Sequence, residues 1–561
     1  MSDTPATPTH PESGHPAAGV AKWGVLAVLA AAQFLMVLDQ AVMNVAISTL
    51  VEDFDTTVTT IQAVIALYAL VMAGLMLTGG KLGDMWGRRR AFAVGLCIYG
   101  AGSALTAASW SVPTLTLGWS VLEGIGAALV LPAMVALVAA NFEGKDRALA
   151  YGVLGGVAGA GIAVGPIVGG WFTTELTWRV VFVGEVLVAV AILFGTRWIR
   201  EPERSGKPRL DWVGGVLSAL GLGIVVFGVL QASNWGWLRP SDSPIEPFGF
   251  SLTPFVIAAG GIVLAAFARW EGRREERGED PLVHLHLLRI SSLRGGVSML
   301  LAQNLVLMGI FFTVPLFLQI VQGLDALETG IRMLPASIGL FVSALVGSAL
   351  AARYPARTLV RCGLAVVFVA TLMLLGTVEP ELDNASFLAA MGVLGVGMGL
   401  IVSQLGNVVQ SSVGDDDRSE AGGLQNTSQQ LGSSLGTAIL GAIVITGLIA
   451  SFSSSVAENP RISARVKEQV EVQLSSGGSF VTSEQVEASA RAAKIPPPAV
   501  GQIVDDYEDA QLVALKTAFL AAALLVVASF ATTGRLPRQR FDQLQSASGP
   551  AAGPAPQETM A

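Results

Sequence analysis

Long stretches without a charged residue recur along almost the whole chain. A transmembrane helix needs about 20 predominantly apolar residues to cross a hydrocarbon layer of ~30 Å, and this sequence contains fourteen such windows separated by charged loops. They lie at 24–47, 60–80, 92–108, 113–139, 149–171, 180–197, 212–232, 253–270, 294–320, 331–351, 360–378, 385–412, 428–450 and 512–534. Because only 14% of the 561 residues are charged and 52% are hydrophobic, a soluble globular chain is excluded. The sequence predicts an all-α integral membrane protein with fourteen transmembrane helices.

The distribution of Lys and Arg among the loops predicts the orientation of these spans. Basic residues near span ends are retained on the cytoplasmic side, and with both termini in the cytoplasm about 25 of the 34 Lys and Arg residues fall in inner loops. The exception is the extracytoplasmic loop 451–511, but long loops translocate largely regardless of charge. We expect a multi-pass protein of the cytoplasmic membrane, with residues 1–22 and 535–561 as disordered cytoplasmic tails.

The loop between the second and third spans has the sequence GKLGDMWGRRRAF, from Gly80 to Phe92. Its glycines allow a tight turn, and its arginines lie where the cytoplasmic face of a membrane attracts basic side chains. Composition alone would fit an ordinary cytoplasmic turn. The order of residues, however, resembles the GxLaDrxGrr signature of the major facilitator superfamily, which implies a role in gating. The residues at its defining positions are Asp84, Gly87, Arg88 and Arg89.

A second motif, GIAVGPIVGG, lies in the fifth span. Its glycines recur every four residues and form a smooth groove, and its proline removes a backbone donor and bends the helix. Close helix packing alone would account for this pattern. The motif also resembles the gxxxGPxxGG pattern of exporters and antiporters in the superfamily, which implies that the bend controls access between two halves of the protein. The expected gating residues are Gly161, Gly165, Pro166, Gly169 and Gly170.

Three further stretches extend the resemblance over most of the chain. LDQAVMNVAI at 38–47 is similar to the first span of the fourteen-span drug and proton antiporter branch, although Ala41 and Ser48 depart from its pattern. WRVVF at 178–182 and LDWVG at 210–214 resemble the starts of the sixth and seventh spans of that branch. The resemblance implies the major facilitator fold, in which two six-helix bundles are joined by two inserted helices. The expected limits are 23–197 and 294–534 for the bundles and 198–293 for the insertion.

The second half of the chain repeats the first in a degraded form. The sequence GSALAARYPAR, which starts at Gly347, occupies the place equivalent to the Gly80 motif but has Ala351 where the aspartate would be. Duplicated halves predict alternating access around a site near the bilayer midplane. Gly339, Ser343 and Gly347 also repeat the four-residue spacing of the fifth-span glycines, and we expect these two small-residue ridges to face each other.

Polar residues inside the spans should line the transport path. In the first and twelfth spans they recur on one helix face at 100° per residue. Such a stripe can also serve as interhelical hydrogen bonding without contact to a ligand. The expected path residues are Gln33, Gln40 and Asn44 in the first span, Asn304 in the ninth, and Ser403, Asn407 and Gln410 in the twelfth.

Acidic side chains inside the spans are the most unusual feature of the sequence. Glu123 is the only ionisable residue within 112–140, although a charged carboxylate in hydrocarbon costs several kcal/mol. Superfamily antiporters commonly have RxxQG at this place, and here Ser120 replaces the arginine. Together with Asp39 and Glu185, Glu123 is expected to carry protons, because burial disfavours the charged form of a carboxyl group. The alternative is a permanently protonated Glu123 that hydrogen-bonds a neighbouring span.

These features predict a proton-driven exporter of amphipathic small molecules and not an enzyme. The sequence has no GxxxxGK[ST] nucleotide-binding signature, so we expect the proton gradient as energy source, without a cofactor or a metal. The net charge of −8 gives no nucleic-acid footprint; we expect a monomer whose partners are its substrate, protons and the lipid bilayer. Two alternatives remain open: a dedicated exporter of one metabolite, antibiotic or siderophore, and a non-transporting membrane sensor with 451–511 as its reading domain.

Overall fold

Fourteen helices dominate the computed structural model. It describes residues 16–142, 144–201, 210–240, 243–414, 417–475, 480–493 and 495–538. Within these ranges there are helices and no strands, and fourteen helices are long and apolar enough to cross a membrane. Each predicted window overlaps one of these helices, so the all-α fold and the number and order of the spans are confirmed.

The first six spans pack against one another. They are α1 (Pro16–Val45), α3 (Val58–Trp86), α4 (Arg88–Ala107), a fourth span built from α5 (Val112–Leu115), η1 (Thr116–Glu123) and α6 (Gly124–Asn141), then α7 (Gly144–Glu175) and α8 (Arg179–Gly195). The short α2 (Ile47–Asp53) follows α1. Gly87, at φ 101°, lies between α3 and α4 in a conformation that few other residues adopt. Helix α6 contacts α3 and α4, while α1 contacts α7 and α8.

The last six spans form a second packed group. They are α11 (Ser291–Leu316) with its π-helical end η5 (Phe317–Val321), α12 (Ala326–Leu350), α13 (Ala356–Thr377), α14 (Asn384–Ser411), α15 (Arg418–Glu458) and α18 (Pro497–Ser529), which is followed by η7 (Thr532–Arg535). Helix α14 contacts α12 and α13, and α15 contacts α11 and α18. Asp325 caps α12 by accepting a hydrogen bond from the amide of Glu328 at 2.7 Å.

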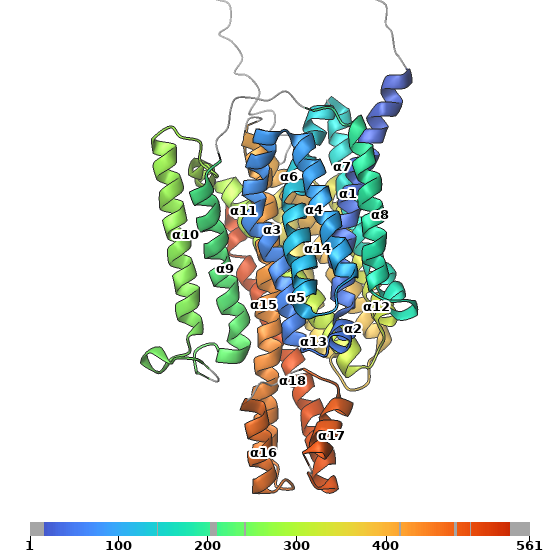
Figure 1. Ribbon diagram of the computed structural model, residues 1–561, viewed down its shortest axis with the longest axis vertical. Helices are drawn as coiled ribbons and strands as arrows, with labels where there is room; N and C mark the ends of the chain where they lie inside the picture. Colours follow the sequence, from blue (N-terminus) through green and yellow to red (C-terminus); the bar gives the residue numbers. More distant parts are fainter. Residues whose placement is uncertain are drawn as a thin grey trace, which may run out of the picture.

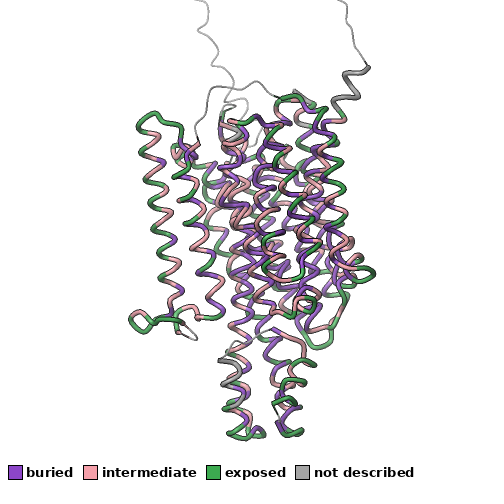
Figure 2. The backbone as a smooth tube through the Cα atoms, viewed as in Figure 1, coloured by how far each residue is buried: buried purple, intermediate pink, exposed green. Residues whose placement is uncertain are grey.

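Two helices lie outside both groups, at the left of Figure 1, and one of them packs against members of each. They are α9 (Trp212–Trp235) and α10 (Thr253–Glu276). Helix α9 packs on α3 and α15 and also on α10. Few residues of α10 are buried (Figure 2), namely Thr253, Gly260 and Glu271, so most of its apolar surface is left for lipid. These are the two helices expected between the bundles.

The segment predicted as the loop 451–511 is mostly helical. Helix α15 continues to Glu458, and α18 begins at Pro497. Between them, α16 (Ala464–Ser475) and α17 (Ser483–Ala492) extend from one end of the molecule (Figure 1). The extension has its own buried residues, including Phe480 and Tyr507, so it is a small packed helical unit.

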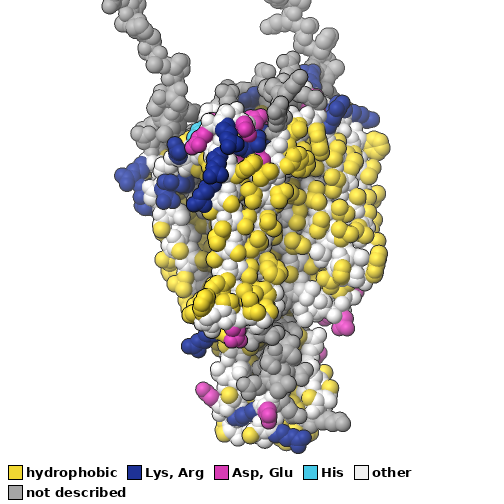
Figure 3. All heavy atoms as spheres, turned by 60° about the vertical axis from the view of Figure 1, so that its left-hand side comes forward, with side chains coloured by type: hydrophobic (Ala, Val, Ile, Leu, Met, Phe, Trp, Pro, Cys, Tyr) yellow, Lys and Arg dark blue, Asp and Glu magenta, His cyan; other side chains and the backbone are white. Residues whose placement is uncertain are grey.

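The two ends of the molecule differ in charge. Figure 3 shows a broad hydrophobic belt with most of the visible Lys and Arg at one end and fewer at the other. We call this end, which includes the turn at Arg88–Arg90, the basic end, and the opposite end, which includes α16 and α17, the hairpin end. Residues 1–15 and 539–561, most of the two predicted tails, lie outside the described residues. Residues 16–22, also assigned to the disordered tail, are instead the first turns of α1.

The fifth and tenth spans pack together, as expected, but the predicted facing of their ridges is wrong. A methyl group on Gly161 or Gly169 would lie 3.0 Å from Val37 or 2.9 Å from Val42, both on α1. The ridge on α12 faces α14 instead, since a methyl group on Gly339 would lie 2.6 Å from the carbonyl of Gly392. Spacing identified both ridges as packing surfaces, but every helix in a bundle has several neighbours, and spacing does not choose among them.

The contact between α7 and α12 is closed at the hairpin end. A Cβ on Gly170 would lie 2.5 Å from the carbonyl oxygen of Ala326 and 2.7 Å from Cα of Leu327. The amide of Leu327 donates to Thr174 Oγ1 at 3.2 Å, and Ser337 Oγ donates to the carbonyl of Ile162 at 3.0 Å. The two helices therefore touch through their backbones here.

Towards the basic end the same two helices diverge. A methyl group added to Gly152, Gly155 or Gly156 of α7 would meet nothing within 4 Å. On α12, Leu345 and Val346 are exposed. The seam between α7 and α12 is thus closed at the hairpin end and open at the basic end.

Candidate functional site: a buried cluster of three acids

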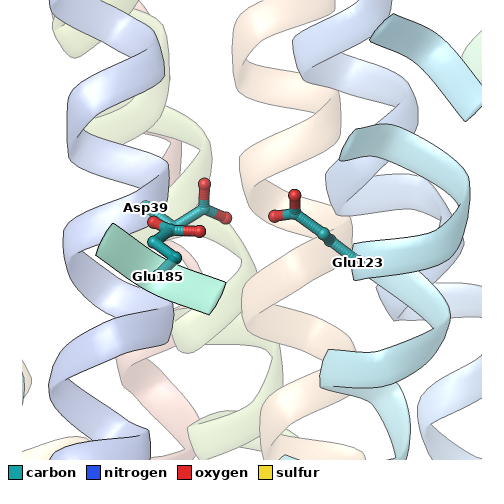
Figure 4. Close-up of side chains that lie close together, drawn as sticks. All are labelled: Asp39, Glu123 and Glu185. Carbon is teal, nitrogen blue, oxygen red and sulfur yellow. The ribbon is translucent and has the colours of Figure 1, made fainter. Parts of the chain in front are cut away.

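Three acidic side chains from three spans meet inside the first group of helices (Figure 4). Asp39 comes from α1, Glu123 from the end of η1 and Glu185 from α8, and none is more than 2% exposed. One oxygen of each acid lies within 4.8 Å of one oxygen of the other two. The three residues predicted as proton carriers are therefore brought together by the fold.

The depth of the cluster follows from its positions along the helices. Asp39 lies six residues before the end of α1, and Glu185 lies six residues after the start of α8. At 1.5 Å per residue each is about 9 Å from the hairpin end of its helix. Glu123 lies about 16 Å from the start of its span at Val112. The cluster therefore occupies the half of the first bundle nearer the hairpin end.

Neutral donors hold one oxygen of each acid. Trp119 Nε1 donates to Asp39 Oδ1 at 2.7 Å, and Thr106 Oγ1 donates to Glu123 Oε1 at 3.1 Å. The hydroxyl groups that donate to Glu185 Oε2 are those of Ser103 at 3.1 Å and Tyr99 at 3.2 Å. These four donors were not among the predicted site residues. Trp119 lies four residues before Glu123, and Ser103 and Thr106 are polar residues within an apolar span. Helical spacing and polar residues in an apolar span could therefore have pointed to these donors.

The local backbone explains how these groups reach one another. Segment η1 is π-helical, a rare conformation that is frequent at functional sites. A Cβ on Gly102 would lie 2.7 Å from Glu123 Cγ, and one on Gly118 would lie 2.7 Å from Thr106 Oγ1. The two glycines let α4 and η1 approach closely enough for the Thr106 hydroxyl to bond Glu123.

Among the described residues, the second carboxyl oxygen of each acid has no hydrogen-bond partner. These atoms are Asp39 Oδ2, Glu123 Oε2 and Glu185 Oε1, and the nearby Tyr68 hydroxyl is also buried without a partner. The Tyr68 ring stacks on Trp119 with centroids 4.4 Å apart. Among the described residues, no Lys or Arg forms an ion pair with the cluster.

Ionisation of all three acids would be costly in this arrangement. Two carboxylates within 4.8 Å of each other repel by roughly 3.5 kcal/mol or more at an effective dielectric constant of about 20. With no cation to offset this repulsion, the cluster needs to bind positive charge. Protons can supply it, and so can a hard cation, since carboxylate and hydroxyl oxygens are the ligands that Na⁺, Mg²⁺ and Ca²⁺ prefer.

Two of the three predicted path residues of α1, Gln40 and Asn44, lie one turn apart and are joined by a hydrogen bond. Gln33 and Gln40 are half-buried and Asn44 is buried. The Asn44 side-chain amide donates to the carbonyl of Gln40 at 2.8 Å. This bond within one helix restrains Asn44 but does not show a ligand contact.

The path residues of the second half are more dispersed. Asn304 on α11 donates to the carbonyl of Leu300 at 3.1 Å and is half-buried, while Asn407 on α14 is exposed. Ser403 accepts a hydrogen bond from Gln404 at 2.9 Å and lies against α12, and Gln410 lies near Gly422 on α15. Among the described residues, no hydrogen bond joins these side chains to those predicted on α1.

The predicted gate at the basic end is held by its own ion pair. Arg88 pairs with Asp84, four residues earlier, and donates to the carbonyl of Gly80 at 3.2 Å. The Arg89 amide donates to Glu201 at 3.4 Å. Of the predicted gating residues, Gly161, Gly165 and Gly169 pack against α1, whereas Gly170 and Pro166 contact α12.

Hydrogen bonds between the two halves involve residues that were not among the predicted path or gating residues. Gln62 on α3 donates to the carbonyls of Thr437 and Ala438 on α15 at 3.0 and 3.1 Å. Near the hairpin end, Ser48 Oγ donates to Gln319 at 2.6 Å. Gln62 and Gln319 are polar residues within apolar spans, which is the pattern that predicted the path residues.

A comparison with protein families identifies the fold. A family model described as Major Facilitator Superfamily matches residues 29–437. The chain belongs to the major facilitator superfamily. It is thus a multi-pass membrane protein of a transporter family and not an enzyme.

Relatives in the superfamily are named as transporters and resistance proteins. The chain is 29% identical over 545 residues to the probable actinorhodin transporter of Streptomyces coelicolor, covering 92% of each chain. It is 32% identical over 446 residues to the puromycin resistance protein pur8 of Streptomyces alboniger, covering 78% of this chain and 85% of the relative. It is 29% identical over 514 residues to the multidrug efflux pump LfrA of Mycolicibacterium smegmatis, covering 91% and 95%.

Solved structures share the fold at low sequence identity. The bacterial homologue of the human lysosomal transporter Spinster, in an inward-facing and unoccupied conformation, matches with a TM-score of 0.55 and 14% identity, covering 93% of this chain and 99% of that chain. The human organic anion transporter MFSD10 matches with a TM-score of 0.50 and 14% identity, covering 92% and 98%.

In this major facilitator protein, Ser120 occupies the position at which related antiporters commonly have an arginine. Ser120 Oγ donates to the carbonyl of Val64 on α3 at 2.8 Å. The small hydroxyl group bonds the backbone of a neighbouring span and adds no positive charge. The acids of this chain therefore meet without the cation that the family resemblance led us to expect.

Proposed function

We propose that this protein is a proton-driven exporter of amphipathic small molecules that works by alternating access. In this proposal the basic end and both termini face the cytoplasm, because Lys and Arg are retained on that side. The substrate enters from the cytoplasm and leaves at the hairpin end, while protons move the other way. The acid cluster carries the protons.

The observation that carries this proposal is the buried arrangement of Asp39, Glu123 and Glu185. Three carboxyl groups share one small volume, each has an oxygen without a partner, and no basic side chain among the described residues pairs with them. Buried acids in membrane proteins commonly mark proton or ion pathways. Binding of protons removes the mutual repulsion, so release of a proton can be tied to a change in helix packing.

The packing of α7 on α12 supports a cytoplasm-accessible state. The seam is sealed around Gly170 and open around Gly155. A substrate could therefore reach the region between the halves from the basic end. In the proposed cycle the Gly170 contact opens when the protein turns outward, and the ion pair between Asp84 and Arg88 belongs to the inner gate.

The acids and the path residues have separate roles in this proposal. Asp39 lies on the same helix as Gln40 and Asn44, so substrate contact on α1 can be transmitted to the cluster through one rigid element. The path residues of α11 and α14 contact the substrate from the other half. Among the described residues no basic side chain pairs with the acid cluster, which favours neutral or cationic substrates over anions.

The substrate class is taken from the relatives, whose names include single antibiotics and a multidrug efflux pump. Broad drug export is the leading proposal, and export of one metabolite, antibiotic or siderophore by the same machinery is the alternative. A transport panel of dyes and antibiotics distinguishes them by the number of compounds moved. A sensor that reads its ligand through α16 and α17 would move none.

The deciding experiment uses purified protein in vesicles with an imposed pH gradient. Uphill substrate transport and substrate-induced proton release are measured for the wild type, Glu123→Gln and Asp39→Asn. The matched control is Glu271→Gln, because Glu271 is also a fully buried acid but lies on α10, where it accepts hydrogen bonds from the amides of Leu282 at 2.7 Å and Val283 at 3.1 Å.

We expect Glu123→Gln to abolish proton-driven uphill transport while the control retains it. Both replacements imitate the neutral acid, so folding should survive, and facilitated exchange of substrate without a gradient should persist. Undiminished proton release and uphill transport in Glu123→Gln would rule out its role as carrier and leave Asp39 or Glu185. Transport driven by a Na⁺ gradient at equal pH would replace protons by a cation at the same cluster.

A further inference from the structure

A basic pocket lies at the start of α13, far from the acid cluster. It has a volume of about 310 Å³ and is lined by Pro355, Arg357, Thr358, Arg361 and Arg538. Because Ala356 begins a membrane span, the pocket lies at the level of lipid headgroups. It joins the first turns of α13 to the segment that follows η7, so two parts of the chain that are distant in sequence contribute to it.

The three arginines of this pocket have no acidic partner among the described residues. The Nε atom of Arg357 is buried and forms no hydrogen bond with any residue that the structure describes. Arg361 Nε donates to Thr533 Oγ1 at 3.0 Å, which fixes η7 against α13. Three guanidinium groups around one open pocket repel one another, and the described protein residues provide no anion between them.

The equivalent place in the first half shows what is missing. There Asp84 pairs with Arg88 inside the GKLGDMWGRRR motif. In the degraded copy that starts at Gly347, Ala351 occupies the position of Asp84 and Pro355 that of Arg88, so both members of the ion pair are replaced. Arg357 lies at the position of Arg90, and the copy contains no acid that could pair with it.

The backbone adds further positive potential to the pocket. Helix α13 has 22 residues, and its N-cap residue, Pro355, provides no side-chain hydrogen bond. The amides of Ala356 and Arg357 form no hydrogen bond with the described residues. Unpaired amides and the positive end of the helix dipole favour an anion at this end of a helix, and bidentate arginines favour a phosphate group.

A lipid fits this site better than a free ion because an apolar strip leads away from it. Exposed residues of α13 recur below the pocket at helical spacing, namely Arg361, Ala365, Val369 and Leu372. They share one face of the helix. A headgroup phosphate in the pocket would place its acyl chains along this strip, within the hydrophobic belt.

We propose that the pocket formed by Arg357, Arg361 and Arg538 binds the phosphate group of an anionic phospholipid. The bound lipid neutralises the three arginines and links α13 to the segment after η7. This inference rests on the pocket and on the membrane spans, and it is independent of the proposed proton coupling.

The test uses the purified full-length protein in a neutral detergent. Binding of phosphatidylglycerol, phosphatidylcholine and inorganic phosphate is measured by native mass spectrometry and by the shift in unfolding temperature. The test variants are Arg357→Gln and Arg538→Gln, the second of which alters an exposed side chain and should not affect folding. The control is Arg273→Gln, which removes a basic residue of α10 at the same end of the molecule.

Phosphatidylglycerol should raise the unfolding temperature of the wild type by several degrees, and phosphatidylcholine should not. Each test variant should bind phosphatidylglycerol at least tenfold more weakly, whereas Arg273→Gln should bind it as the wild type does. If inorganic phosphate alone produces the full shift, the lipid assignment is wrong and the pocket is a free-anion site. Equal weakening by Arg273→Gln would show diffuse attraction to the basic end and overturn the proposal.

Discussion

The contact between α7 and α12 at the hairpin end makes a quantitative prediction for Gly170→Ala. The added Cβ would lie 2.5 Å from the carbonyl oxygen of Ala326, and the nearest backbone must retreat by about 0.9 Å to reach the 3.4 Å of an ordinary contact. Neighbouring atoms are backbone, so no side chain can rotate away. Overpacking of this kind costs about 1–3 kcal/mol.

That cost falls on the closed form alone, because the contact is absent once the two helices separate. A difference of ~1–3 kcal/mol changes the ratio of two conformations by roughly 5–150-fold. Gly170→Ala should therefore shift the population towards a form that is open at the hairpin end. Gly155→Ala is the matched control on the same helix, since its added methyl group meets nothing within 4 Å.

The shift can be measured by pulsed electron spin resonance between labels at Glu175 and Glu328, which are exposed at the hairpin end of α7 and α12. A longer distance should become dominant in Gly170→Ala, and Gly155→Ala should not lengthen it. An unchanged distance distribution in Gly170→Ala, with normal folding, would show that this backbone contact does not hold the gate closed.

Three further predictions follow from individual contacts. Partial burial raises the pKa of Asp53, but the hydrogen bonds from Trp178 and Arg179 and the Arg179 charge outweigh it and hold the pKa below the ordinary 3.8. The ionised carboxylate therefore stabilises the folded protein fully above pH 3.8, and this stabilisation is lost as the pH falls through the lowered pKa of the folded state. Acid should accordingly lower the unfolding temperature more for the wild type than for Asp53→Asn. Trp119→Phe keeps an aromatic ring against Tyr68 but removes the hydrogen bond to Asp39, which is worth about 1.5–3 kcal/mol if the acceptor is charged. Uphill transport should therefore fall while substrate binding persists. Transport equal to that of the wild type would exclude a coupling role for Trp119. Asp84→Asn should change the balance of conformations in the same spin-label assay without loss of substrate binding, and unchanged transport kinetics would make the motif only a topological anchor.

The fourteen spans were predictable because hydrophobicity and length are local properties of a sequence. A window such as 212–232 must avoid water whatever surrounds it, and α9 (Trp212–Trp235) lies where expected. The buried acids were identifiable for the same reason, since a carboxylate within an apolar span is unusual in any fold. Their meeting was not predictable in detail, because it depends on how α1, η1 and α8 pack together, and Thr106 reaches Glu123 only because Gly102 and Gly118 let α4 approach the π-helical η1.

The class of protein, its spans, its motifs and its small-residue ridges could be predicted from local patterns of residues. Which surfaces meet depends on the three-dimensional packing: Gly161 and Gly169 face α1 instead of α12, Gly170 closes the hairpin end, and three acids share a volume with no paired basic side chain among the described residues. Periodicity places a residue on one face of its own helix, but each helix here touches several others. The choice among these neighbours depends on the packing of side chains that are far apart along the chain, and a local pattern does not contain that information.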